Sequence, residues 1–235
     1  MRMITIDDPR WHDTFPHTVR LRAEDDEWLP GVMLRCDDAN SWPVGTTGYY
    51  VAKGRPASTG HLNNAGAYIV ATGVSLGRLA RSTAVDREQL ERTTFLPELR
   101  RLYGMARPTA SLLGTIPPFR VCPLCVGEGK MLGRQLALPN VGMCPRPGHN
   151  ILLVDTCRCG ASLEPYRKGT APFTCGDCGL EWARLPAVVA KDDIATATKR
   201  VIALYDTFFT RGTRRSVEAA LRHIKGRATP AREVI

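Results

Sequence analysis

Seven of the eight cysteines in this chain lie between residues 120 and 182, and together with His149 they form closely spaced pairs. Thiolate sulfur and imidazole nitrogen are the donors that zinc prefers in closed tetrahedral sites. Four such pairs within about sixty residues provide two complete sets of four ligands. In chain order the pairs are Cys122 with Cys125, Cys144 with His149, Cys157 with Cys159, and Cys175 with Cys178.

We assign consecutive pairs to the same Zn²⁺ ion, because each pair places two donors on one tight turn and the next pair completes the coordination. The first ion would bind to the first two pairs, and the second ion would bind to the last two. Four protein ligands leave no position for a substrate, so both ions are expected to be structural. The alternative is an interleaved arrangement in which the first and third pairs share an ion, and the spacing disfavours it.

A disulfide framework is the other interpretation of the cysteines, and it would need an oxidising compartment. The first residues, Met1-Arg2-Met3-Ile4, lack the apolar segment of a secretory signal. No apolar run reaches the roughly 18 residues of a membrane span. We therefore expect a cytoplasmic protein with metal-binding thiols. Cys36 lies among apolar positions and is predicted to be a buried core thiol.

The formal charge of +9 is unevenly distributed. Residues 1–40 carry a net charge of −4, whereas residues 41–121 and 199–235 each carry +6. This polarity indicates an acidic surface for a protein partner and basic surfaces for nucleic-acid phosphate, although solvated surface charge would produce the same pattern. The candidate docking residues are Glu24, Asp25, Asp26, Glu27 and Trp28. The candidate nucleic-acid contacts are Arg78, Arg81, Arg87, Arg211, Arg214 and Arg215.

Apolar periodicity predicts helices on both sides of the cysteine-rich block. They are expected near residues 28–36, as a short pair within 74–92, over 96–113 with a break at Pro108, and at 192–209 and 217–225. Asp192 and Asp193 would cap the helix at 192–209. Short strands are expected at 131–138 and 151–154. The pair within 74–92 is compatible with a DNA-reading helix-turn-helix, although most such pairs are plain packing.

The sequence therefore predicts a mainly α fold with small zinc-ribbon and knuckle β elements. We divide it into an N-terminal helical domain (1–118), a tandem zinc-finger block (119–186) and a short helical C-terminal tail (187–235). Pro117-Pro118 and Pro186 mark the two boundaries.

The zinc block resembles the TniQ family, whose members are accessory proteins of multi-gene bacterial transposons. The resemblance is carried by Arg120-Val121-Cys122-Pro123-Leu124-Cys125, by Cys144-Pro145 with Gly148-His149-Asn150, and by Cys157-Arg158-Cys159-Gly160. Upstream, Glu27-Trp28-Leu29 and Leu34-Arg35 resemble the family's opening helix. The spacing of Cys144 and His149 is wider than is usual in the family. The tail after the zinc block is short, and this short tail disfavours recognition of one target sequence by this chain alone.

The resemblance implies a non-catalytic adaptor that links a target-site selector, such as a CRISPR effector complex, to an AAA+ ATPase regulator of transposition. The implied partners are that ATPase, a selection complex containing DNA or guide RNA, and nucleic-acid backbone, with no membrane. The alternative is a stand-alone zinc-containing DNA-binding regulator.

The residues themselves also argue against an enzyme. Both zinc sets are complete, no HExxH motif occurs, and the neighbouring acids Asp7-Asp8 and Asp25-Asp26 point apart on most backbones. Gly127-Glu128-Gly129-Lys130 is too short for a phosphate-binding loop.

Overall fold

The computed structural model describes residues 19, 21–24, 26–52, 65–83, 85–104, 113, 116–129, 132–167 and 170–212. This part of the chain is mainly helical, as the sequence predicts. Its helices are α2 (Leu29–Ala39), α3 (Thr46–Val51), α4 (Ala65–Ile69), α5 (Leu76–Thr83), α6 (Arg87–Arg92), α7 (Leu96–Tyr103), α8 (Pro123–Gly127) and α9 (Asp192–Arg211), with 3₁₀ turns η3 (Arg134–Ala137) and η4 (Trp182–Arg184).

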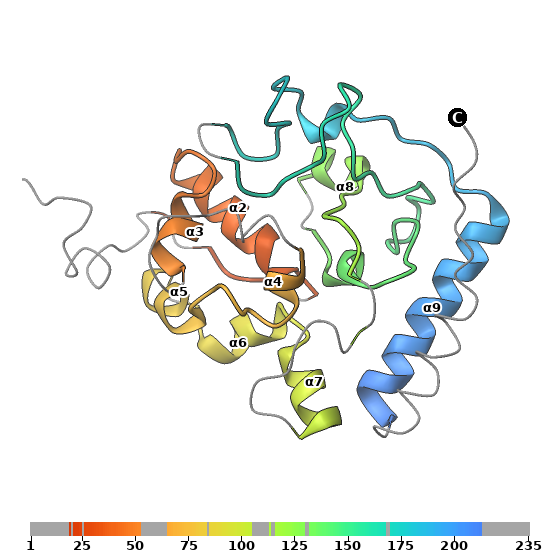
Figure 1. Ribbon diagram of the computed structural model, residues 1–235, viewed down its shortest axis with the longest axis horizontal. Helices are drawn as coiled ribbons and strands as arrows, with labels where there is room; N and C mark the ends of the chain where they lie inside the picture. Colours follow the sequence, from red (N-terminus) through yellow and green to blue (C-terminus); the bar gives the residue numbers. More distant parts are fainter. Residues whose placement is uncertain are drawn as a thin grey trace, which may run out of the picture.

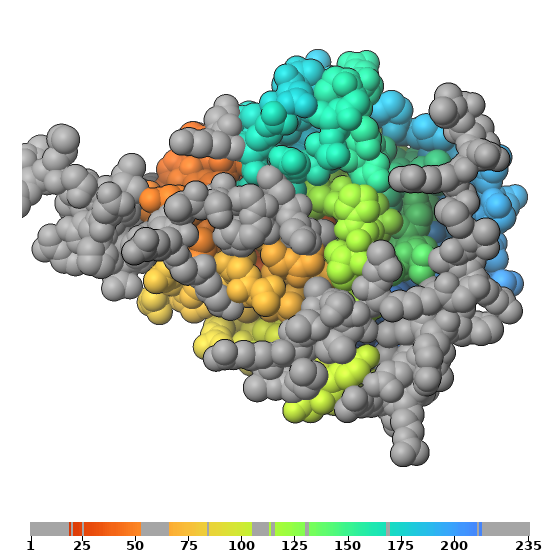
Figure 2. All heavy atoms as spheres, viewed as in Figure 1, coloured from red at the N-terminus to blue at the C-terminus, as the bar shows by residue number. Residues whose placement is uncertain are grey.

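The helices α2 to α7 gather on one side of the molecule, the loops of the cysteine-rich block lie beside them, and α9 runs along the far edge (Figure 1). In the space-filling view the cysteine-rich block, green to teal, lies directly against the orange and yellow helices (Figure 2). No helix among the described residues combines the length and apolar character needed to cross a bilayer.

The helix α2 is the centre of the helical part. Its residues Leu29, Val32, Met33, Leu34 and Cys36 have no exposed surface, and within α2 only Asp38 is exposed. Pro30 lies in the first turn, where the backbone N–H that proline lacks would have no partner within the helix. Trp28 precedes the helix in an extended conformation. The helix predicted near residues 28–36 and the buried thiol of Cys36 are both confirmed.

The pair α5 and α6 forms as predicted, and the two helices are in contact. The next helix, α7, is shorter than the predicted 96–113. It ends at Tyr103 because Gly104 adopts a left-handed conformation with φ +61° and donates its N–H to the carbonyl of Arg100. Pro108, the predicted break, lies outside the described residues.

The strand predicted at 131–138 is wrong, because this segment forms η3 instead. The carbonyl groups of Leu136 and Leu138 accept hydrogen bonds from the guanidinium of Arg120, so a side chain occupies acceptors that a neighbouring strand would otherwise use. Residues 151–154 form isolated antiparallel bridges, with Ile151 opposite Val189, Leu152 opposite Met143, and Val154 opposite Val121.

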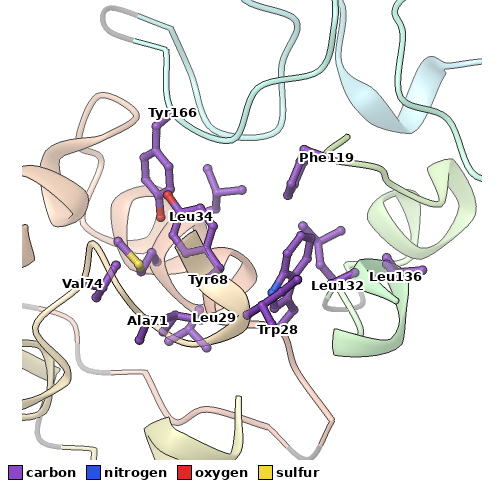
Figure 3. Close-up of a cluster of buried hydrophobic side chains, with 14 of the residues drawn as sticks. Trp28, Leu29, Leu34, Tyr68, Ala71, Val74, Phe119, Leu132, Leu136 and Tyr166 are labelled. Atoms are coloured by element: carbon purple, nitrogen blue, oxygen red, sulfur yellow. The ribbon is translucent and has the colours of Figure 1, made fainter. Parts of the chain in front are cut away.

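A continuous series of aromatic rings joins the helical part to the cysteine-rich block. Trp28 stacks on Phe119 at 5.4 Å between ring centroids, and Phe119 lies 5.7 Å from Trp182. On the other side Trp28 meets Tyr68, which stacks on Tyr166 at 5.8 Å. In Figure 3 Phe119 lies above Trp28, and Tyr68 and Tyr166 lie to the upper left of Trp28. The division at residue 118 stays a prediction, and it falls within one shared core.

The helix predicted at 192–209 is confirmed as α9, with both Asp192 and Asp193 in its first turn. Their negative charges interact favourably with the positive end of the helix dipole. Neither of them is the N-cap residue, which is Lys191. At the other end, Arg101 of α7 donates to the carbonyls of Phe208 and Phe209. This contact satisfies terminal carbonyls and ties α9 to α7. The helix predicted at 217–225 lies outside the described residues.

Candidate metal centres

The first four predicted ligands converge in a buried cluster, which we call centre one: Cys122, Cys125, Cys144 and His149. The Nδ1 atom of His149 lies 3.3 Å from the sulfur of Cys122, 3.2 Å from that of Cys125 and 3.6 Å from that of Cys144. The sulfurs of Cys125 and Cys144 are 3.6 Å apart. Four donor atoms therefore surround one point.

These spacings fit a metal ion. Zn–S bonds of about 2.3 Å and Zn–N bonds of about 2.0 Å imply tetrahedral edges of about 3.8 Å between sulfurs and about 3.5 Å between sulfur and nitrogen. A disulfide would bring two sulfurs to about 2.05 Å. The described cysteines are all free of disulfide bonds. The disulfide interpretation is therefore wrong, and the donors of centre one fit a structural zinc ion.

Local backbone structure explains how centre one forms. Cys122 precedes α8 in an extended conformation and its sulfur accepts the N–H of Cys125, at 3.4 Å. A proline opens the helix and fixes the turn between these ligands. On the other side of the centre, the N–H of Cys144 donates to the carbonyl of Ile151 at 2.8 Å, which holds the loop containing His149 against the first pair.

His149 is held by a residue that the sequence analysis did not single out. Its Nε2 atom lies 3.1 Å from Oε1 of Glu128, which follows the end of α8. When Nδ1 binds a metal, Nε2 carries the proton and donates to this carboxylate, which fixes the ring orientation and raises the basicity of the ligand. Glu128 lies three residues after Cys125, and nothing in the spacing indicates that it reaches His149.

The last four ligands form centre two, made of Cys157, Cys159, Cys175 and Cys178. The sulfurs of Cys157 and Cys178 are 3.6 Å apart, as are those of Cys159 and Cys175. These distances also fit a zinc tetrahedron. Unlike centre one, this cluster is only half enclosed, because Cys157 and Cys175 are buried and Cys159 and Cys178 are exposed.

Centre two is built from two similar turns. The N–H of Cys157 donates to the carbonyl of Ala161, and the N–H of Cys175 donates to that of Leu180. In each turn a glycine follows the second cysteine in a left-handed conformation, Gly160 at φ +89° and Gly179 at φ +70°. The donors therefore group in consecutive pairs, as predicted, and not in the interleaved arrangement.

The clusters favour metal over free thiols. In centre one, a hydrogen bond from the Cys125 thiol is the main cause that lowers the pKa of Cys122 to about 2. In centre two, burial opposes ionisation of Cys175, but backbone N–H groups of Cys178 and Asp177 bring its pKa down to about 7. The neighbouring Cys122 side chain raises the pKa of the Cys125 thiol, and metal binding displaces the proton of a coordinating thiol.

The two centres lie next to each other, because α8 of centre one is in contact with η4, which follows centre two. A side chain at Gly127 would meet the Cβ atom of Ala183 at 3.7 Å. Trp182 of η4 is also part of the aromatic series, so the zinc block is rigidly attached to the helical part.

Arg120, two residues before the first ligand, holds the backbone of residues 136–141 of the zinc block in place. Its guanidinium donates to the carbonyls of Val141, Leu136 and Leu138 at 2.6 to 3.0 Å. Burial lowers its pKa to about 10, which still leaves it charged at neutral pH. In the sequence Arg120 is visible only as the first residue of the motif Arg120-Val121-Cys122, which does not reveal this role.

The candidate docking residues do not form one exposed patch. Glu27 is 1% exposed and forms an ion pair with Arg35 at 2.7 Å, and Trp28 is in the core. Their assignment to a docking surface is corrected here, because both side chains are needed inside the fold. Glu24 and Asp26 are exposed, and Asp25 lies outside the described residues.

The candidate nucleic-acid residues are only partly available. Arg87 is exposed but pairs with Glu91 on the same helix at 3.3 Å, and Arg78 donates to the carbonyl of Ala52. Arg81 is exposed on α5. The side chain of Arg211, together with Arg214 and Arg215, lies outside what the structure describes.

Comparison with known protein families now adds to this geometry. The family model TniQ matches residues 18–153, which is more than half of the chain. The match includes α2 and all four ligands of centre one, and centre two follows directly after it. A search of curated proteins gives no match. With this match across the helical part and the first metal centre, the chain belongs to the TniQ family.

Proposed function

We propose that this protein is a non-catalytic, zinc-stabilised adaptor of DNA transposition. It would link a target-site selector, such as a CRISPR effector complex, to an AAA+ ATPase that regulates the transposase. Membership of the TniQ family implies a role associated with transposition, and the resemblance described above supplies the partners.

The observation that carries this proposal is the construction of the metal centres. Each has four protein donors, so neither offers an open coordination position for a substrate or an activated water. Two ligands of centre two, Cys157 and Cys175, belong to the core that surrounds α2, and Leu153 packs against both that core and the separate apolar cluster of centre one. Such metals stabilise a rigid body, and a rigid body can hold two partners in a fixed geometry.

The alternative, a stand-alone DNA-binding regulator, finds less support in α6. This helix would be the recognition helix of the α5–α6 pair, and its two arginines, Arg87 and Arg92, pair with Glu91 and Glu88. Glutamates on such a helix repel phosphate and weaken non-specific attraction to DNA. Arg81, Arg211, Arg214 and Arg215 remain the proposed contacts with nucleic-acid backbone.

Affinity capture tests the adaptor role. The tagged, zinc-loaded chain is used to capture proteins from a lysate of its host, and the chain stripped of zinc by a chelator serves as the control. We expect an AAA+ ATPase to be retained by the loaded chain and lost with the metal. A loaded chain that retains no ATPase but protects one DNA sequence in a footprint would instead establish the regulator.

A further inference from the structure

A groove of about 610 Å³ separates the loop of centre one from α9. Residues 143, 145–148 and 150 form one wall, together with Gln135, and residues 198, 199, 202, 203 and 206 of α9 form the other. The groove takes no part in the metal centres.

Both walls of the groove are fixed in place. The loop segment 145–148 lies between two ligands of the same centre, Cys144 and His149, and contains two prolines. The N–H of Gly142 donates to Thr198 of α9 at 3.2 Å, and a side chain at Gly142 would come within 3.3 Å of Ile194. Binding in such a preformed groove requires little ordering of the protein.

One end of the α9 wall carries Lys199, and Arg146 lines the groove from the loop side. Neither cation has an ion-pair partner among the described residues. Carboxylates are the groups that guanidinium and ammonium ions pair with best, so these two cations favour an acidic ligand.

The middle of the groove is apolar and its other end is negatively charged. Met143 is buried beneath it and Ile202 is half-buried in its wall. Asp206 lies seven residues after Lys199 on α9, a distance of about 10 Å along the helix. An extended chain covers this length with about three residues.

We propose that this groove binds an extended segment of a protein partner, with an acidic side chain at Arg146 and Lys199 and an apolar side chain over Met143 and Ile202. A nucleic-acid backbone fits the groove less well, because Asp206 would face its phosphates. The inference rests on the proposed adaptor role only for the origin of the partner, since the groove itself can be tested without it.

Selection from a random peptide display library on the zinc-loaded full chain provides the test. We expect enriched peptides to carry an aspartate or glutamate close to an apolar residue. Synthetic fluorescein-labelled copies of the enriched peptides are then titrated against two pairs of variants. Zinc content and circular dichroism confirm that each variant is loaded and folded.

The first pair compares the double change Arg146→Glu and Lys199→Glu with Arg200→Glu, which removes an exposed cation outside the groove. The second compares Ala203→Trp, which fills the groove, with Ala197→Trp on the exposed face of α9. We expect a loss of affinity of about tenfold or more for the groove variants, and wild-type affinity for both controls.

The proposal is overturned if no acidic and apolar peptide is enriched, if the groove variants bind like wild type, or if they lose affinity for duplex DNA and not for peptide. Peptide binding that depends on the groove, in a chain that captures no ATPase, supports the groove and contradicts the adaptor role. Capture of the ATPase without selected peptides contradicts the groove alone.

Discussion

Single residues divide into those whose role the sequence reveals and those whose role needs the fold. The eight metal ligands were predictable because short spacings force their donors onto the same turn. Glu128 was not, because its partner His149 is 21 residues away and only the folded loop brings them within 3.1 Å.

Removing the carboxylate of Glu128 tests its role in positioning His149. We expect Glu128→Ala to lower the zinc affinity of centre one by about tenfold to a hundredfold, and Glu128→Gln to have a smaller effect because its amide oxygen still accepts a hydrogen bond. Competition with a chromogenic chelator measures the affinity. Glu181→Gln, which changes an exposed ion pair with Arg184 near centre two, is the control. Wild-type affinity in both Glu128 variants would show that the contact is incidental.

Glu27 and Trp28 show where charge and composition mislead. A run of four acids predicts an exposed patch, yet one of them pairs with Arg35 inside the fold. Burial raises the pKa of Glu27 above its ordinary value, and the hydrogen bond from Arg35 opposes that rise. Neither effect can be inferred until the position of Arg35 relative to Glu27 is known.

At the scale of elements, predictions succeeded where local signals decide the outcome. Apolar periodicity located α2 and α9, and α9 also has acidic residues in its first turn. The segment around η3 was mispredicted because Arg120, at least 16 residues away in sequence, takes its carbonyls. Periodicity carries no information about such long-range acceptors.

The two metal centres are separate elements, and single substitutions can distinguish them. We expect Cys157→Ser to lose one of two zinc ions and to unfold the turns of centre two, because metal binding at such sites contributes about 10 kcal/mol to folding. Centre one keeps its ion. Elemental analysis of the purified chain measures the zinc content.

Cys36→Ala is the matched control for this substitution, since Cys36 is buried but belongs to neither cluster. It should retain both ions. Retention of two ions per chain by Cys157→Ser would contradict the assignment of this ligand.

For the whole molecule, the shared aromatic core is the decisive feature. Three sections could be read from the sequence, but the stacking of Trp28 on Phe119 and the contact of Phe119 with Trp182 join two of them. Contacts between distant segments cannot be read from one sequence. The predicted boundary at residue 118 therefore marks a change in the sequence, whereas the side chains on its two sides pack into one core.

Trp28→Ala tests this coupling. Removal of a fully buried tryptophan should reduce the free energy of unfolding by about 3 to 5 kcal/mol, and helical signal and zinc retention should still be lost in one transition. Circular dichroism and a zinc-sensitive dye, followed in the same denaturant titration, measure both. Trp42→Ala, at a partly exposed position, should cost less. Two separate transitions would show that the sections fold independently.

The unequal enclosure of the two centres has a consequence for the lifetime of the molecule. Centre one is sealed, whereas two sulfurs of centre two face solvent. Competing chelators and oxidants in the surroundings therefore reach the outer ion first. Metal scarcity would thus empty the outer centre while the buried inner centre still holds its ion.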